Sequence, residues 1–182
     1  MDSDKRQRYQ IAMVSTYYPV TSFLDCLIMH DGAEQTNGSD VLSLLHSGSV
    51  FMVNSRKRNG LILFKRYHAE FAGPGAVVGG NYDRDCQGVL PIGNLSLLIP
   101  DSYEQRQDAY KIRRQWIRLI KQITEKSYPI QRVQKILDQF EQYFPSQMVS
   151  QLPDEAFALL VGVLPQTVAV VRRLAADAEG RL

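Results

Sequence analysis

The sequence predicts an α+β protein with a strand-rich N-terminal part, a long connecting helix and an all-helical C-terminal part. Glycine is frequent among short apolar runs up to residue 100 and nearly absent from there to Gly162. This distribution is typical of strands and turns followed by helices. The 182 residues are 45% hydrophobic, enough apolar material for one compact domain or two small ones. We therefore divide the chain into residues 1–100, 101–128 and 129–182.

The N-terminal part is expected to form a small antiparallel β sandwich or barrel. The candidate strands cover residues 11–17, 49–53, 60–64, 76–79 and 95–99, and residues 39–46 are a candidate short helix. The segment between Val53 and Leu61 ends in Asn59-Gly60. Asn-Gly is typical of β-hairpin turns because both residues tolerate positive φ. We therefore expect a hairpin at this segment.

A long helix is predicted over residues 103–127. Asp101 or Ser102 can cap its first free N–H groups. Its apolar residues are spaced by four, three and four, the spacing of a heptad seam: Ile112, Trp116, Leu119 and Ile123. The seam predicts either the interface of a homodimer or a helix packed on its own chain, and both interpretations stay open here.

The C-terminal part is predicted to contain a helix over residues 130–144 and then two shorter helices within residues 153–176. Pro153 suits the start of the first short helix, and Pro165 suits the start of the second. Between them, Gly162 allows a sharp turn because glycine reaches positive φ without steric cost. Val168, Val171 and Leu174 are expected to face inward from the second helix. Two short helices with a glycine-containing turn are the geometry of the DNA-binding helix-turn-helix.

The pattern Ala156-x-x-x-x-Val161-Gly162-Val163-x-x-x-Thr167-Val168-x-x-x-x-x-Leu174 resembles the C-terminal motif of the Crp/Fnr family of bacterial transcription factors. The resemblance implies a jelly-roll effector domain, a dimerisation helix and a DNA-reading helix-turn-helix, in that order. The cyclic-nucleotide members of the family carry Gly-Glu and, about ten residues later, a phosphate-binding Arg. Here Gly80 occupies the Glu position and no Arg matches, so we expect no cyclic AMP site.

The resemblance implies a homodimeric regulator that binds double-stranded DNA through its last helix. The candidate DNA-binding residues are Gln166, Thr167, Val170, Arg172 and Arg173. Gln can pair with adenine, Thr can reach a phosphate or a thymine methyl, and Arg can neutralise phosphates. The apolar residues of this helix also suit a second interpretation, in which the unit is a protein-interaction module that docks a protein partner.

Composition gives partial support to nucleic-acid binding and little to catalysis. The net charge is only +2, so positive charge must be concentrated locally if DNA is bound. Basic residues outnumber acidic ones between residues 103 and 135, either as a DNA-flanking surface or as a solvated helix face. No nucleophile–base pair stands out. Asp83 and Asp85 are interpreted as turn residues. His68-x-Glu70 is only a faint match to the metal-binding motif of jelly-roll enzymes.

The sequence favours no cofactor, no metal and no enzymatic activity. Cys26 and Cys86 lie far apart in no metal-binding pattern, as expected for a reducing compartment. No apolar run approaches the roughly 18 residues of a membrane span, and the N-terminus has no signal-peptide pattern. We therefore expect a cytoplasmic protein.

Overall fold

The chain folds as a mixed α+β protein, as the sequence predicts, in a computed structural model that describes residues 38–179. The predicted strand at residues 11–17 and Cys26 lie outside this range. The helices are α3 (Gly38–His46), α4 (Tyr103–Thr124), α5 (Pro129–Tyr143), α6 (Ser146–Gln151), α7 (Asp154–Val161) and α8 (Pro165–Glu179). The strands are β1 (Val50–Val53), β2 (Gly60–Phe64), β3 (Ala69–Ala72), β4 (Val77–Gly79), β5 (Gly88–Ile92) and β6 (Leu97–Leu98), with a short 3₁₀ helix, η1 (Gly80–Tyr82).

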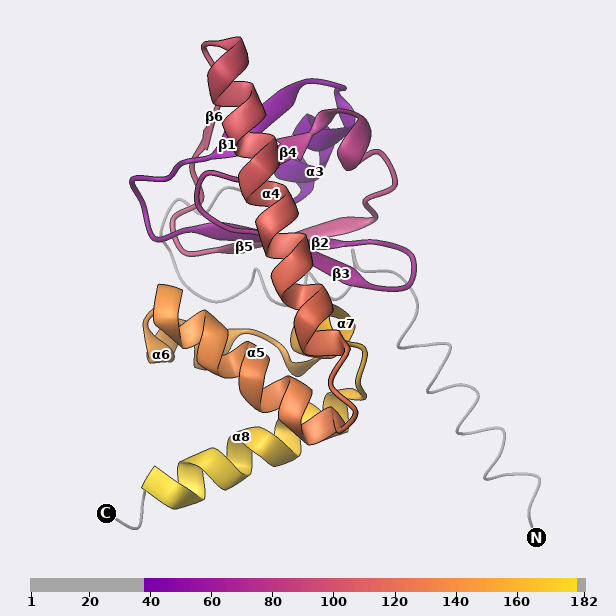
Figure 1. Ribbon diagram of the computed structural model, residues 1–182, viewed down its shortest axis with the longest axis vertical. Coiled ribbons are helices and arrows are strands. Elements are labelled where there is room, and N and C mark those ends of the chain that lie inside the picture. The colour runs from indigo at the N-terminus through magenta and orange to yellow at the C-terminus, as the bar shows by residue number, and fades with distance from the viewer. Residues whose placement is uncertain (1–37, 180–182) are drawn as a thin grey trace, which may run out of the picture.

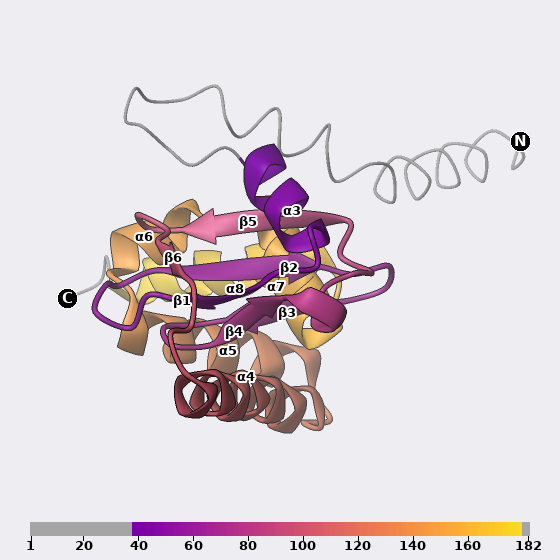
Figure 2. The same cartoon turned by 90° about the horizontal axis from the view of Figure 1, so that it is seen from above.

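The described strands form two small antiparallel sheets. One sheet has the order β4-β1-β6 and the other has the order β3-β2-β5. In the second sheet Ile62 lies opposite Phe71 on one side and Leu90 on the other. Figure 2 shows the strands between α3 on one side and α4 on the other. Strands β3 and β5 had no candidate in the sequence: β3 contains the charged Glu70, and β5 contains Gly88 and Pro91, residue types that are infrequent in strands.

The expected hairpin between β1 and β2 is wrong, because the two strands belong to different sheets. The side chain of Asn59 is buried, and its amide donates to the carbonyls of Asn54 and Lys57 at 3.0 and 3.1 Å. The backbone N–H of Asn54 donates to Ser96 O at 2.8 Å. Asn59 therefore closes a wider loop that carries the chain from one sheet to the other.

Helix α4 packs directly on the turn between β3 and β4. A Cβ on Gly73 would lie 2.4 Å from the Trp116 ring, and one on Gly75 would lie 2.8 Å from the Ile112 side chain. Gly75 also has a φ of 81°, a conformation that favours glycine. The glycines of this turn therefore let the backbone pass close beneath α4.

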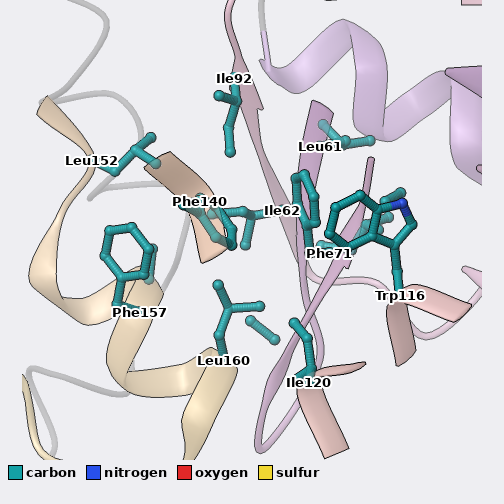
Figure 3. Packing of buried hydrophobic residues seen from close by; sticks show 14 of the residues in the cluster. Leu61, Ile62, Phe71, Ile92, Trp116, Ile120, Phe140, Leu152, Phe157 and Leu160 are labelled. Atoms are coloured by element: carbon teal, nitrogen blue, oxygen red, sulfur yellow. The ribbon is translucent and has the colours of Figure 1, made fainter. Parts of the chain in front are cut away.

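A single hydrophobic cluster joins the sheets to the C-terminal helices (Figure 3). Phe71 of β3 lies at its centre, with its ring centroid 4.8 Å from those of both Trp116 and Phe140. Phe140 in turn packs edge-on against Phe157 of α7, with centroids 5.1 Å apart. The three sequence divisions thus share one core, and α7 is held against both the sheet and α5.

The heptad seam of α4 faces its own chain for much of its length. The buried residues of the helix are Ala109, Arg113, Trp116, Ile120 and Ile123. Trp116 and Ile123 are therefore enclosed within the chain, whereas Ile112 and Leu119 remain partly exposed at the edge of the cluster. A spacing of four and three residues suits packing on a sheet as well as packing on a second helix. Two of the four seam residues, Trp116 and Ile123, are buried within the chain and are therefore not available to a second copy.

Candidate nucleic-acid interface

Helices α7 and α8 form a bent pair at the end of the molecule away from the sheet β4-β1-β6 (Figure 1). The two helix axes are bent by 113° across residues 162–164. Helix α7 buries most of its side chains, including Phe157, Leu160 and Val161. Helix α8 packs against α5 and α7 and buries Val168 and Val171. The pair therefore has one helix in the core and one at the surface.

The turn between the two helices depends on Gly162. Its φ of 63° and ψ of 53° are left-handed, and glycine adopts this conformation without the cost that a Cβ imposes. The N–H of Val163 donates to Ala158 O at 3.1 Å and so satisfies a carbonyl at the end of α7. Pro165 then opens α8 at a position where no N–H is needed.

The outward-facing surface of α8 comprises Gln166, Val170, Arg173 and Leu174, which we call the outer face. Gln166 and Arg173 are exposed, and within residues 38–179 the side chain of Arg173 makes only a 3.3 Å hydrogen bond, to Ala169 O on its own helix. Val170 is 39% exposed and Leu174 is 57% exposed. The expectation that Leu174 faces inward is therefore wrong, because residues 173–178 of α8 are all exposed.

Arg172 is separated from the other predicted DNA-binding residues and points into the protein. Its guanidinium donates to the carbonyls of Leu152 and Val149 at 2.8 and 3.1 Å. It lies 3.0 Å from Asp154 Oδ1 as an ion pair and stacks over the Phe157 ring at 5.1 Å. Arg172 therefore caps the end of α6 and holds α8 against α7. Because its guanidinium is bound within the protein, it is not placed to contact a DNA phosphate.

Thr167 also departs from the outer face. Its side chain is half-buried and lines a pocket of about 690 Å³ between the β2–β3 turn, α4 and the α7–α8 turn. The predicted DNA-binding set is therefore divided by the structure. Gln166, Val170 and Arg173 share one exposed surface, whereas Thr167 and Arg172 do not.

Comparison of the chain with protein-family models, curated proteins and solved structures found no match in any of the three.

The basic stretch of residues 103–135 is mostly a solvated surface, with two exceptions. Arg114, Arg118 and Lys121 are exposed on α4. Arg132 donates through Nη1 to Gly162 O at 3.4 Å and through Nε to Lys126 O, and so joins the α4–α5 turn to the α7–α8 turn. Arg113, grouped by sequence with the surface cations, is completely buried.

Arg113 belongs to a buried charge cluster that sequence analysis did not find. Its Nη2 donates to Glu70 of β3 and, at 3.2 Å, to Asp83 Oδ1. The same Asp83 oxygen accepts from Lys65 Nζ at 3.2 Å, and Lys65 also binds Asp85. The turn interpretation of Asp83 is incomplete, because its other oxygen accepts the Gly79 N–H at 2.8 Å and its side chain is fully buried. No local signal reveals the cluster, since its members come from four separate segments.

The ionisation of the cluster is set by burial and by pairing. Burial opposes the charge on Lys65, but the hydrogen bond to Asp85 and the charge of Asp83 outweigh it and raise the lysine pKa. Burial also opposes the charge on Glu70, but Arg113 outweighs it and lowers the pKa of that carboxyl. The cluster therefore pairs two cations, Lys65 and Arg113, with three carboxylates and links α4 to the sheet.

Residues 38–179 include His, Cys and acidic side chains that could bind a metal ion or act as nucleophiles. No group of three or more His, Cys, Asp or Glu side chains in this range is placed to hold a metal ion. His68 Nε2 lies 3.4 Å from Glu70 Oε1, but its side chain is 57% exposed. Cys86 is buried, which raises the pKa of its thiol to about 11. Among the described helices none is by itself long and apolar enough to cross a membrane, although the bent pair of α7 and α8 reaches that length and composition together.

Proposed function

We propose that the protein is a DNA-binding transcription regulator of the Crp/Fnr type that places the start of α8 in the major groove. The observation that carries the proposal is the bent helix pair with an exposed second helix. Its bend of 113° falls in the range of about 90–120° that is typical of helix-turn-helix units. In such units the first residues of the second helix contact the base edges.

The chemistry of the outer face supports the same proposal. The Gln166 amide is exposed near the start of α8 and can donate and accept at adenine N6 and N7. Val170 follows one turn later and can contact a thymine methyl group. Arg173 follows on the same surface, where it can bind a phosphate or a guanine. We interpret the two small sheets as a reduced jelly roll, which preserves the order of elements that the sequence resemblance implies.

The proposal differs from the family pattern in two respects. Gly80 stands where cyclic-nucleotide binders have Glu, and its φ of 60° suits glycine; the proposed regulator therefore has no cyclic AMP site. Two of the four seam residues, Trp116 and Ile123, are inside the chain. We therefore do not propose a homodimer that uses all four seam residues of α4.

The test is selection of duplexes from a random-sequence DNA library by the full chain, followed by gel mobility shifts with the selected duplex. We expect Gln166→Ala and Arg173→Ala each to weaken binding about tenfold, as for the loss of one base or phosphate contact. The matched controls are Gln87→Ala and Arg84→Ala, which change exposed side chains on the sheet side of the molecule. Recovery of no enriched duplex, or equal losses in variants and controls, would overturn the proposal.

A second candidate function is docking of a protein through the same helix pair. Leu164, Val170 and Leu174 are 66%, 39% and 57% exposed. Val170 and Leu174 lie one turn apart on α8, and adjacent exposed apolar side chains favour a protein partner. This candidate predicts that Leu164→Ser and Leu174→Ser raise solubility and leave DNA unbound in every variant. Duplex binding that survives both substitutions decides for the first function.

A further inference from the structure

The loop between β1 and β2 lies beside a groove of about 720 Å³ that it forms with α4 and the end of α5. We call residues 54–59 the basic loop, because it contains Arg56, Lys57 and Arg58. The groove is lined by these three residues and by apolar side chains that include Ile112, Trp116 and Leu119. We propose that this groove docks an acidic, amphipathic helical segment of a partner protein.

The basic loop is held in a defined shape by its ends. The buried Asn59 amide donates to two carbonyls of the loop, and the Arg56 N–H donates to Asn54 Oδ1 at 3.0 Å. Asn54 is itself fixed to Ser96 through its backbone N–H, at 2.8 Å, and through its side-chain amide, at 3.3 Å. Because these hydrogen bonds hold the loop backbone before binding, the backbone loses less conformational entropy when a partner arrives.

The positive charge of the loop is unbalanced within the described part of the chain. Arg56, Lys57 and Arg58 are all exposed, and none of them forms an ion pair with a residue of the range 38–179. Three adjacent cations repel one another and attract a negatively charged surface. The loop therefore supplies charge complementarity for an acidic partner and little for a neutral one.

The apolar side of the groove determines which kind of acidic partner fits. Tyr143 is 44% exposed, and its ring centroid lies 4.8 Å from that of Trp116. Ile112 and Leu119 are partly buried beside them. Tyr, Trp and Arg are the residues that most often dominate binding energy at protein interfaces. A phosphate backbone would neutralise the loop but leave this apolar surface in water, whereas an amphipathic acidic helix covers both.

The groove is independent of the proposed DNA contact. None of its lining residues belongs to α8. A partner could therefore bind the groove while α8 contacts a duplex, and failure of either proposal leaves the other intact.

Trp116 supplies an internal reporter, because it is the one tryptophan in the chain and it lines the groove. The probe is a synthetic peptide of about 14 residues, four helical turns, with Leu and Phe on one face and Glu and Asp on the other. The comparison probes are a peptide of the same composition without an apolar face and a single-stranded oligonucleotide of similar charge. We expect the amphipathic peptide to change Trp116 fluorescence and to bind at least tenfold more tightly than either comparison probe.

The decisive variants separate the groove from general basicity. Arg56→Ser, Lys57→Ser and Arg58→Ser together should weaken peptide binding tenfold or more and reduce its salt dependence. Tyr143→Ala should weaken it about thirtyfold. The matched control replaces Arg106, Arg114 and Arg118 with Ser, which removes the same charge from exposed positions of α4 outside the groove.

Four outcomes would overturn the proposal: no peptide binding, equal losses in the loop and control variants, tighter binding of the oligonucleotide, or a second copy of the chain in the groove. Sedimentation detects the last, as a dimer that Tyr143→Ala dissociates. Binding of a selected DNA duplex should be unchanged in the loop variant, and Arg173→Ala should leave peptide binding unchanged. These two measurements distinguish failure of the groove proposal from failure of the DNA proposal.

Discussion

Replacing Asp83 with Ala removes the one carboxylate that is shared by two buried cations. Asp83 Oδ1 lies 3.2 Å from both Lys65 Nζ and Arg113 Nη2, and the side chains involved are between 0 and 3% exposed. Loss of one partner from a buried pair costs about 3–5 kcal/mol, because the remaining charge is left without compensation. Asp85 and Glu70 still offset part of the charge, so we take the lower end of this range.

The substitution also leaves the buried Gly79 N–H without its acceptor, which adds about 1 kcal/mol. The expected total is therefore about 4 kcal/mol of unfolding free energy. With a urea dependence of about 2 kcal/mol per molar, the unfolding midpoint should fall by about 2 M. Asp83→Asn keeps an acceptor for Gly79 and should lose about 3 kcal/mol.

Urea titration followed by circular dichroism measures both variants against an exposed control. Asp108→Ala breaks the surface pair with Lys111, whose two side chains are 66% and 69% exposed, and should change stability by less than about 0.5 kcal/mol. If Asp83→Ala unfolds at the same urea concentration as Asp108→Ala, the buried cluster does not fasten α4 to the sheet and the reasoning fails.

Three further predictions concern the turn, the cluster and the thiol. Gly162→Ala should lower the unfolding free energy by about 1–2 kcal/mol, because a Cβ is strained at a φ of 63° although no atom lies within 4 Å of it; an unchanged urea midpoint would contradict this. Arg113 lowers the pKa of Glu70 in the folded protein below its ordinary value of 4.5. The ion pair between these residues therefore stabilises the fold above pH 4.5, and this stabilisation is lost as the pH falls through the lowered pKa. Glu70→Gln should then show a smaller loss of urea midpoint between neutral pH and pH 4 than the parent, and an equal loss would argue against the pair. Cys86, with its pKa raised to about 11, should react with a thiol reagent at neutral pH only as fast as the protein unfolds; rapid labelling of the folded chain, measured on Cys26→Ser, would show that the thiol is not enclosed.

Helix positions followed from the sequence because their ends carry local chemistry. Ser102 accepts the Gln105 N–H at 3.1 Å as the cap of α4, and Pro129 opens α5. Gly162 and Pro165 likewise placed the turn between α7 and α8. Each of these signals acts within about four residues, which is the range that a sequence pattern can report.

Strand pairing and the charge cluster did not follow from the sequence because they depend on distant residues. Asn59-Gly60 favours a hairpin locally, but the buried Asn59 side chain instead closes a loop between two sheets. Arg113 appeared to be one cation among many on a basic helix, and only the fold brings it to Asp83, 30 positions earlier in the chain.

The sequence predicted which residues of α8 are buried better than it predicted which of its charged residues are exposed. The apolar spacing placed Val168 and Val171 correctly in the core. Arg172 and Arg173 are neighbours with the same charge, yet one is engaged by three carbonyls and the other projects outward. Which of them faces solvent is set by the packing of α8 on α6 and α7, and that packing has no signature in the local sequence.

We propose that α8 binds duplex DNA through its outer face. Fluorescence anisotropy of a labelled selected duplex, measured over a series of salt concentrations, tests it directly. We expect the affinity for the duplex to fall with salt in the parent and in Arg84→Ala. In Arg173→Ala, affinity should be about tenfold lower, with the salt slope reduced by about one if Arg173 contacts a phosphate. Absence of duplex binding by the folded parent at low salt would contradict the claim.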